Sequence, residues 1–258
     1  MAIDVIDLRS FYASPLGESA QRCLARVLAE RWTSCAGLTL LGMGYASPYL
    51  GALREKAAQV QVFMPAEQGA EPWPPDGPNV SELVDSCALP LPDSSMDRIL
   101  VVHALENVSH PRDMLAELWR VLAPSGRLIL LAPNRAGVWA RFDHTPFGQG
   151  EPYSRSQLRG LMRDALFSPI HWGEALYAPP SERRLALRVA PQLERIGRTL
   201  SLPGYGLHVV EATKLLYQPV AFRQPARRAM RSWQPALAAP GRVGAPQGSP
   251  LSPSLTPD

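Results

Sequence analysis

Apolar residues along the chain recur with two kinds of spacing, one helical and one continuous. From Gly17 to Trp32 they follow the three- and four-residue spacing that predicts an amphipathic helix. Short, largely apolar runs, the third of them weaker, occur at 37–41, 60–64, 80–84, 99–102 and 127–132, and the run at 99–102 is apolar without alternation. Runs without alternation are typical of strands that are buried on both faces, as in a parallel sheet.

Helical segments separate these runs, so strands and helices alternate along the chain. Further helices are expected at 48–58, 111–122, 154–166 and 182–200, and further strands at 168–172 and 208–217. The order predicts an α/β protein with a Rossmann-like, seven-stranded, mostly parallel sheet and helices on both faces. Such sheets bind ligands at the carboxyl ends of their strands. The residues just after each strand are therefore the first candidates for a site.

Composition changes after Gln218. The chain has 258 residues and 27 prolines, and many of the prolines fall in this last stretch, among Ala, Ser, Gly and Arg. A segment with so few large apolar residues cannot bury enough surface to offset chain entropy. We therefore expect one folded domain over residues 1–222, followed by a disordered tail over 223–258.

The positive charge of the chain belongs to this tail. Residues 223–258 contain five arginines and one aspartate, a net charge of +4, whereas the whole chain carries +3. The expected domain is therefore close to −1. Nucleic-acid enzymes usually carry a basic face on the folded body, so nucleic acid is not the expected partner, although the tail leaves contact with RNA or an anionic membrane open.

The cysteines and the N-terminus argue against several kinds of protein. Cys23, Cys35 and Cys87 form no C-x-x-C pair, and no histidine stands at metal-ligand spacing, so neither a metal site nor a disulfide framework is expected. No apolar run has the length of a signal peptide or of a membrane span. We expect a cytoplasmic protein, and its oligomeric state stays open.

The first candidate site is the turn Gly42-Met43-Gly44 after the run at 37–41. Glycines permit positive φ and let a ligand approach the backbone with no Cβ in the way. A lone G-x-G also occurs in ordinary tight turns, and the dinucleotide fingerprint would place a third glycine where this chain has Ser47. The turn alone therefore only marks a candidate ligand site.

A second stretch is more specific. Residues Asp85–Asp97 are D-S-C-A-L-P-L-P-D-S-S-M-D, Leu105-Glu106-Asn107 follows the next strand, and 120–126 is R-V-L-A-P-S-G. In order and spacing these segments resemble the class I S-adenosylmethionine-dependent methyltransferases, in particular the type-11 subgroup. That subgroup commonly shows D-x-x-x-L-P-F-P-D-x-S-F-D, then L-E-H, then R-V-L-K-P-G-G. The resemblance covers about residues 40–134.

The resemblance implies a cofactor, S-adenosylmethionine, and a division of the domain. It implies an N-terminal helix at 17–32, a cofactor-binding core at 37–134 and substrate-side elements at 135–217. Carried over residue by residue, it implies contacts to the cofactor from the glycine turn, the strand ends and the loops after them: Gly42, Gly44, Tyr45, Glu67, Asp85, Ser86, His103 and Leu105.

Two departures from the family pattern concern acidic residues. The family often has an acid before its first glycine, where this chain has Leu41, and an acid at the end of the second strand, where this chain has Met64-Pro65. Glu67 is the nearest acid, so either it reaches back to the ribose or cofactor affinity is weakened. Asp85 could equally cap its own loop.

Candidates for catalysis come from two places. Methyl transfer depends largely on alignment, and a general base helps only if the nucleophile must lose a proton. His103 and Glu106 follow the fourth strand, and His144 and Tyr153 lie in the loop 141–153. That loop mixes aromatic, charged and glycine residues without periodicity, so it is either a substrate wall or a surface connector.

The sequence leaves three hypotheses open. The first is a methyltransferase for a small-molecule or lipid-like acceptor, and the second is a catalytically silent domain kept for protein interaction. The third is an RNA- or ribosome-directed methyltransferase that uses the basic tail. Phe11 and Tyr12 are either contacts over the cofactor or core aromatics that anchor an N-terminal helix.

Overall fold

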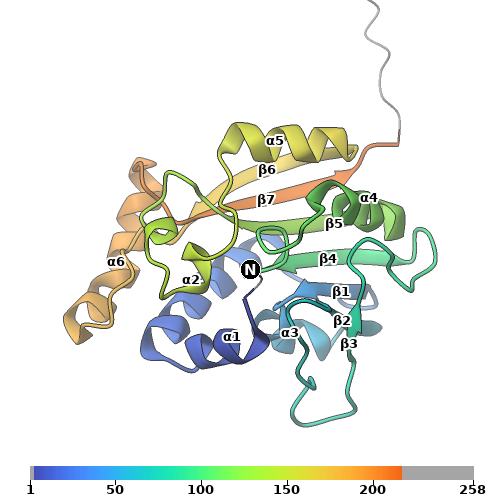
Figure 1. The fold of residues 1–258 in the computed structure, drawn as a ribbon, viewed down its shortest axis with the longest axis horizontal. Helices are drawn as coiled ribbons and strands as arrows, with labels where there is room; N and C mark the ends of the chain where they lie inside the picture. Colours follow the sequence, from blue (N-terminus) through green and yellow to red (C-terminus); the bar gives the residue numbers. More distant parts are fainter. Residues whose placement is uncertain (1–2, 217–258) are drawn as a thin grey trace, which may run out of the picture. The chain divides into compact units, whose positions relative to one another are not determined.

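The computed structural model describes residues 3–216, which are built around one seven-stranded sheet (Figure 1). The strands lie in the order β3-β2-β1-β4-β5-β7-β6. Their bounds are β1 Thr39–Gly44, β2 Gln59–Pro65, β3 Ser81–Val84, β4 Met96–Val102, β5 Leu122–Pro133, β6 Phe167–Ala175 and β7 Leu207–Lys214. All neighbouring strands pair in parallel except β7, which is antiparallel to β5 and β6. The predicted Rossmann-like, mostly parallel sheet is confirmed.

This topology gathers most strand ends at one edge of the sheet. The carboxyl ends of the strands parallel to β1 lie there, and β7 begins there, because Leu207 pairs with both Pro133 and Ala175. The order of the strands reverses between β1 and β4, and this is where open α/β sheets bind their ligands.

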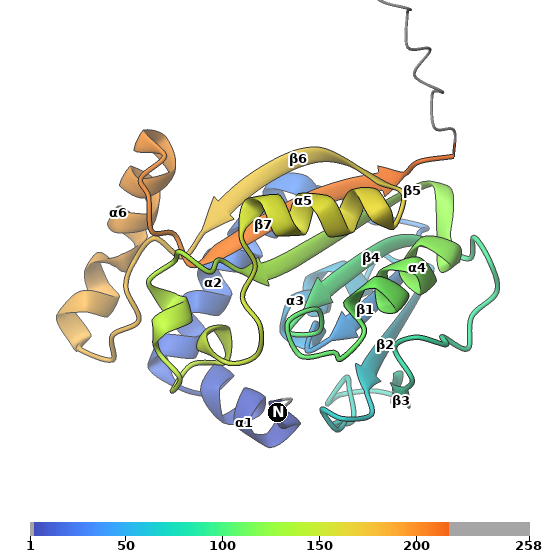
Figure 2. The same cartoon turned by 45° about the horizontal axis from the view of Figure 1, so that its top comes forward.

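The helices cover both faces of the sheet (Figures 1 and 2). They are α1 Val5–Tyr12, α2 Pro15–Arg31, α3 Ser47–Arg54, α4 Pro111–Val121, α5 Arg155–Asp164 and α6 Arg184–Leu200. The first three pack into one hydrophobic core and α4 and α5 into the other.

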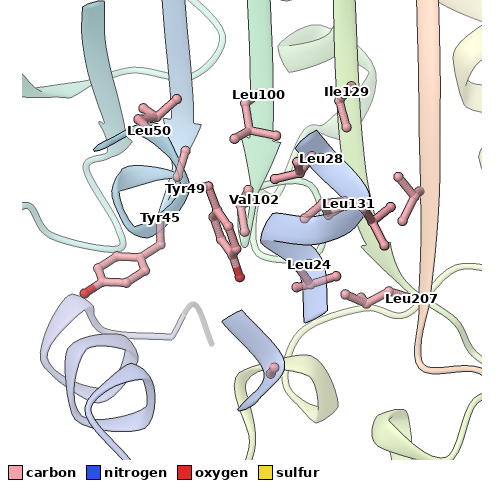
Figure 3. Packing of buried hydrophobic residues seen from close by; sticks show 14 of the residues in the cluster. Leu24, Leu28, Tyr45, Tyr49, Leu50, Leu100, Val102, Ile129, Leu131 and Leu207 are labelled. Atoms are coloured by element: carbon pink, nitrogen blue, oxygen red, sulfur yellow. The ribbon is translucent and has the colours of Figure 1, made fainter. Parts of the chain in front are cut away.

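Successive side chains of a strand point to opposite faces, which explains the unbroken apolar run at 99–102. In β4, Leu100 and Val102 join the core under α2, whereas Ile99 and Val101 join the core under α4. Figure 3 shows the first of these cores, where Leu24 and other residues of α2 lie over the strand side chains.

The structure differs from the predicted elements mainly at two places. The helix α1 was not predicted, because its eight residues bury only Leu8 and Tyr12 and leave too short a pattern to detect. The strand β5 begins at Leu122 rather than after the expected loop, because Leu122 has extended backbone angles and pairs with Met96 ahead of a register shift.

The remaining sequence predictions concern membrane spans, the C-terminal tail, the domain limits and the cellular location. Within residues 3–216 no helix is long and apolar enough to cross a membrane. The predicted disordered tail lies outside the described residues. The domain limits and the cellular location stay predictions.

Candidate active site

The end of β1 is held by close packing against β4 and α3. Gly44 has a φ of +75°, and a Cβ there would collide with the carbonyl oxygen of Val102. A Cβ on Gly42 would lie 2.7 Å from Cδ1 of Leu50. The backbone N–H of Tyr45 donates to the Val102 carbonyl oxygen at 2.8 Å. Both glycines lie within β1 rather than in the turn after it that the sequence predicted; close packing there requires them, and their predicted contact with a cofactor stays a proposal.

A buried chain of hydrogen bonds begins at the end of β4. His103 has a φ of +51°, in the left-handed region that costs a non-glycine residue energy. Its Nε2 lies 2.9 Å from the hydroxyl of Tyr12, and that hydroxyl lies 2.9 Å from the hydroxyl of Tyr49. Its Nδ1 lies 3.3 Å from Oε1 of Glu106. All four side chains are buried, so α1, α3 and the end of β4 are joined away from water.

One order of protons that satisfies every bond of this chain starts from an ionised Glu106. A carboxylate only accepts hydrogen bonds, so an ionised Glu106 requires the proton of neutral His103 on Nδ1. The Nε2 atom of His103 then accepts from the hydroxyl of Tyr12, which accepts in turn from Tyr49. Burial raises the pKa of both tyrosines, so each keeps its proton. This arrangement leaves Nε2 as the basic atom of the chain.

Aromatic rings enclose His103. The Phe147 ring centroid lies 4.7 Å from that of His103, and the Trp139 ring packs edge-on against Phe147 at 5.4 Å. On the other side Tyr12 stacks on Tyr45 with centroids 5.5 Å apart. The loop after β5 therefore packs Phe147 against His103, and its role as a substrate wall stays a prediction.

Two buried acceptor atoms beside His103 have no donor. The side-chain Nε2 of Gln68 donates to the carbonyl oxygen of His103 at 2.8 Å. Its Oε1, and Oε2 of Glu106, have no hydrogen-bond partner in the part of the chain that the structure describes. An unpaired buried acceptor costs about 1–3 kcal/mol. N–H donors are the groups that these two acceptors lack.

An open groove lies at the ends of β2 and β3. Glu67, Asp85 and Ser86 line it together with Val108 and the start of α4. The Oδ1 atom of Asp85 accepts from the backbone N–H of Cys87 at 2.8 Å, so Asp85 does cap its own loop, while its side chain stays exposed in the groove. The structure thus brings three of the predicted cofactor residues together.

The other predicted catalytic residues are placed differently from His103. The hydroxyl of Tyr153 donates to the carbonyl oxygen of Leu105 at 3.1 Å, and burial raises the pKa of Tyr153 to about 12. His144 is exposed and packs on Phe142 at 5.5 Å between ring centroids. Of the three, only His103 lies in the buried chain of hydrogen bonds.

The two positions where the family often has an acid are fully buried apolar residues here. Leu41 packs into the core under α4 and Met64 into the core under α2, and neither is exposed. Glu67 is thus the acid nearest to the end of β2 in the groove, as the sequence suggested.

Sequence reasoning missed Gln68, Tyr49 and Phe147. Each stands in a different element or loop, and no spacing or motif links it to His103. Only the polar Gln68 so soon after an apolar run gave a signal that could have drawn notice.

The fold matches solved methyltransferase structures. One is an S-adenosylmethionine-dependent methyltransferase, possibly a histamine N-methyltransferase, from Thermotoga maritima, with a TM-score of 0.59 and 18% identity over 81% of this chain and 95% of that one. Another is geranyl diphosphate C-methyltransferase from Streptomyces coelicolor, with a TM-score of 0.53 and 13% identity over 74% and 78% of the two chains. At these identities the likeness establishes the class I methyltransferase fold.

Sequence comparisons match part of the chain to a methyltransferase domain. Residues 31–130 match the family model described as a methyltransferase domain. The demethylmenaquinone methyltransferase of Deinococcus radiodurans is 28% identical over 57% of this chain and 54% of its own length. That of Thermus thermophilus is 34% identical over 42% of this chain and 41% of its own length. The chain thus spans about half, or less, of the demethylmenaquinone methyltransferases it matches.

Residues 31–130 are thus similar to the class I methyltransferases of the type-11 subgroup, and the cofactor of such methyltransferases is S-adenosylmethionine. The resemblance inferred from the Asp85–Asp97 and 120–126 segments is confirmed. The ammonium group of this cofactor carries N–H donors of the kind that the unpaired acceptors of Gln68 and Glu106 lack.

Proposed function

We propose that the protein transfers the methyl group of S-adenosylmethionine to a small, lipid-like acceptor. The observation that carries this proposal is the buried Tyr49–Tyr12–His103–Glu106 chain beside the end of β1. It supplies a basic nitrogen at the strand edge where this fold binds its ligands.

The cofactor would be held by groups at three strand ends. Glu67, Asp85 and Ser86 line the groove that suits adenosine, where carboxylates can accept from the ribose hydroxyls. The Oε1 atom of Gln68 would accept from the ammonium group of the methionyl part. The remaining contacts are proposed for Gly42, Gly44, Tyr45 and Leu105. When bound, S-adenosylmethionine supplies a methyl group activated by a positively charged sulfur.

His103 is the residue to which we assign proton transfer. The acceptor's nucleophilic atom forms a bond to the methyl carbon, the carbon–sulfur bond breaks, and S-adenosylhomocysteine leaves. The proton lost by the acceptor goes to Nε2 of His103, and Glu106 stabilises the imidazolium through Nδ1. The hydroxyl of Tyr12 is hydrogen-bonded to Nε2 in this structure, so this bond must break before Nε2 can bond to the acceptor.

An apolar cavity supports a lipid-like acceptor. It lies between α2 and α6, and Trp139 forms part of its wall. Trp139 packs on Phe147, and Phe147 packs on His103, so these two aromatic rings lie between the cavity and the proposed base. Its other walls are largely apolar and include Leu16, Ala20, Leu176, Leu187 and Ala190. The names of the quinone-methylating relatives agree with an acceptor of this kind.

A transfer assay tests the proposal. The full chain is incubated with methyl-tritiated S-adenosylmethionine and either a bacterial lipid extract or a short-chain demethylmenaquinol, and label is counted in the organic phase. His103→Asn should lower the rate by about 10²–10⁴-fold. The matched change His144→Asn, at an exposed histidine, should leave it within about twofold of the parent. Transfer that is unaffected by His103→Asn would overturn the assignment of the base.

The same assay distinguishes a methyltransferase from the second candidate function, a catalytically silent interaction domain. Leu41 and Met64 are buried apolar residues where acids are usual, and this observation favours a catalytically silent interaction domain. Cofactor binding with no transfer to any extract would support that function instead. The RNA-directed alternative depends on the tail, which lies outside the described residues, and it stays a prediction.

A further inference from the structure

The helix α6 presents an apolar stripe to solvent. Leu185, Val189, Leu193, Ile196 and Leu200 are 40–75% exposed and are spaced by three or four residues, so they share one face over about 22 Å. On the opposite face Ala190, Glu194 and Gly197 are buried and Leu187 packs against the core. In an ordinary surface helix the apolar face points to the core. In α6 most of the longer apolar side chains point away from it.

Basic side chains lie beside this stripe. Arg184, Arg188 and Arg195 are exposed, and none of them forms an ion pair with another of residues 3–216. Arg195 also lines the groove between α6 and α2, which it shares with Arg26. Arg198, in the same groove, is paired with Glu30 at 2.7 Å.

We infer that α6 docks on the surface of an anionic phospholipid bilayer. An exposed leucine-rich face flanked by arginines is the pattern of a helix that lies in the membrane interface, with its apolar side chains among the acyl chains. The arginines then meet lipid phosphates, and the groove with Arg26 and Arg195 suits a headgroup.

Charge argues against the other occupants of this face. The tail at residues 223–258 carries a net charge of +4, so it would meet like charge at α6. A second copy of the chain related by twofold symmetry would bring the arginines of one α6 toward those of the other. An anionic membrane is attracted by both α6 and the tail.

The position of α6 relates membrane docking to the candidate active site. The helix follows β6, whose carboxyl end lies at the same edge of the sheet as the candidate active site. Figures 1 and 2 both place α6 at the periphery, beside α2. Docking would therefore bring the apolar cavity between α2 and α6 next to the lipids. The inference concerns membrane binding and stands whether or not the protein transfers methyl groups.

Vesicle sedimentation tests the inference on the full chain. Vesicles of phosphatidylcholine are compared with vesicles that contain about 30% phosphatidylglycerol, a surface that attracts basic segments. The protein should sediment with the anionic vesicles, less so at high salt, and remain in solution with the neutral ones. Leu185→Ser with Leu193→Ser should weaken binding at least about tenfold.

Matched variants make the result specific to α6. Leu83→Ser, at an exposed leucine of β3, should bind like the parent. Arg188→Gln with Arg195→Gln leaves the apolar stripe intact and should also weaken binding, and it serves as the test if the leucine variant does not fold. Binding that survives both α6 variants but is lost when Arg227, Arg228 and Arg231 are changed to Gln would overturn the inference in favour of the tail. A dimer that Leu185→Ser with Leu193→Ser dissociates, with no vesicle binding by the parent, would overturn it in favour of a second copy.

Discussion

Removal of one oxygen atom, the Tyr12 hydroxyl, should leave two buried groups without a partner. This hydroxyl is bonded to Nε2 of His103 and to the hydroxyl of Tyr49, both at 2.9 Å, and all three side chains are buried. A buried polar group left unpaired costs about 1–3 kcal/mol. Tyr12→Phe keeps the ring and its packing. We therefore expect it to lower the free energy of unfolding by about 2–4 kcal/mol.

Removal of the Tyr49 hydroxyl, at the end of the hydrogen-bond chain, should lower the free energy of unfolding by less. Tyr49→Phe removes one hydrogen bond, but the hydroxyl of Tyr12 still bonds to His103, so the expected loss is about 1 kcal/mol. In the double variant only His103 loses its partner, because the Tyr49 hydroxyl that Tyr12→Phe would leave unpaired is gone. The double variant should therefore lose about 2–3 kcal/mol less than the sum of the single changes.

Urea unfolding, followed by circular dichroism and tryptophan fluorescence, measures these free energies. Comparable slopes against urea would show that the variants unfold to similar ensembles. Tyr177→Phe is the control, because its hydroxyl bonds to Glu174 at 2.6 Å and shares no partner with Tyr12. The double change at Tyr12 and Tyr177 should be additive within about 0.5 kcal/mol. The same additivity for Tyr12 and Tyr49 would refute the hydrogen-bond chain.

Two further predictions concern the end of β1 and the start of β7. Gly44→Ala should lower the free energy of unfolding in urea by more than about 3 kcal/mol, because φ is positive and the new Cβ would collide with the carbonyl oxygen of Val102. The control Gly51→Ala, in open space on α3, should be neutral or stabilising by up to about 1 kcal/mol. Equal effects of the two changes would contradict the packing around Gly44. Burial lowers the pKa of His208 below 6.5, so below that pH the unfolded state binds a proton that the folded state does not. The stability that His208 contributes is therefore present above pH 6.5 and is lost as the pH falls below it. His208→Gln should therefore lose less stability than the parent between about pH 7.5 and pH 5.5, and parallel pH profiles would show that His208 does not titrate as its burial implies.

The sheet was predictable because its signal is local and repeated. In the central strand β4 the run at 99–102 is unbroken, since alternate side chains such as Ile99 and Leu100 enter different cores. The helix α1 carries no such repetition. Its importance comes from Tyr12, whose partners Tyr49 and His103 lie 37 and 91 residues away in the sequence.

The candidate site was predictable only where a motif marks it. Asp85 and Ser86 were found from the family pattern, and the structure places them in one groove with Glu67. Gln68 and Phe147 lie beside His103 only because the fold brings the loops after β2 and β5 to the same edge of the sheet. A contact between segments so far apart in the chain leaves no periodicity or spacing in a single sequence.

The central claim is that the strand-end groove binds S-adenosylmethionine, and isothermal titration of the full chain with S-adenosylhomocysteine tests it most directly. We expect saturable binding to one site with a Kd tighter than about 1 mM. Glu67→Gln, in the groove, should weaken this binding, and Glu82→Gln, at an exposed position of β3, should not. Absence of binding at millimolar ligand, or equal binding by the two variants, would contradict the account.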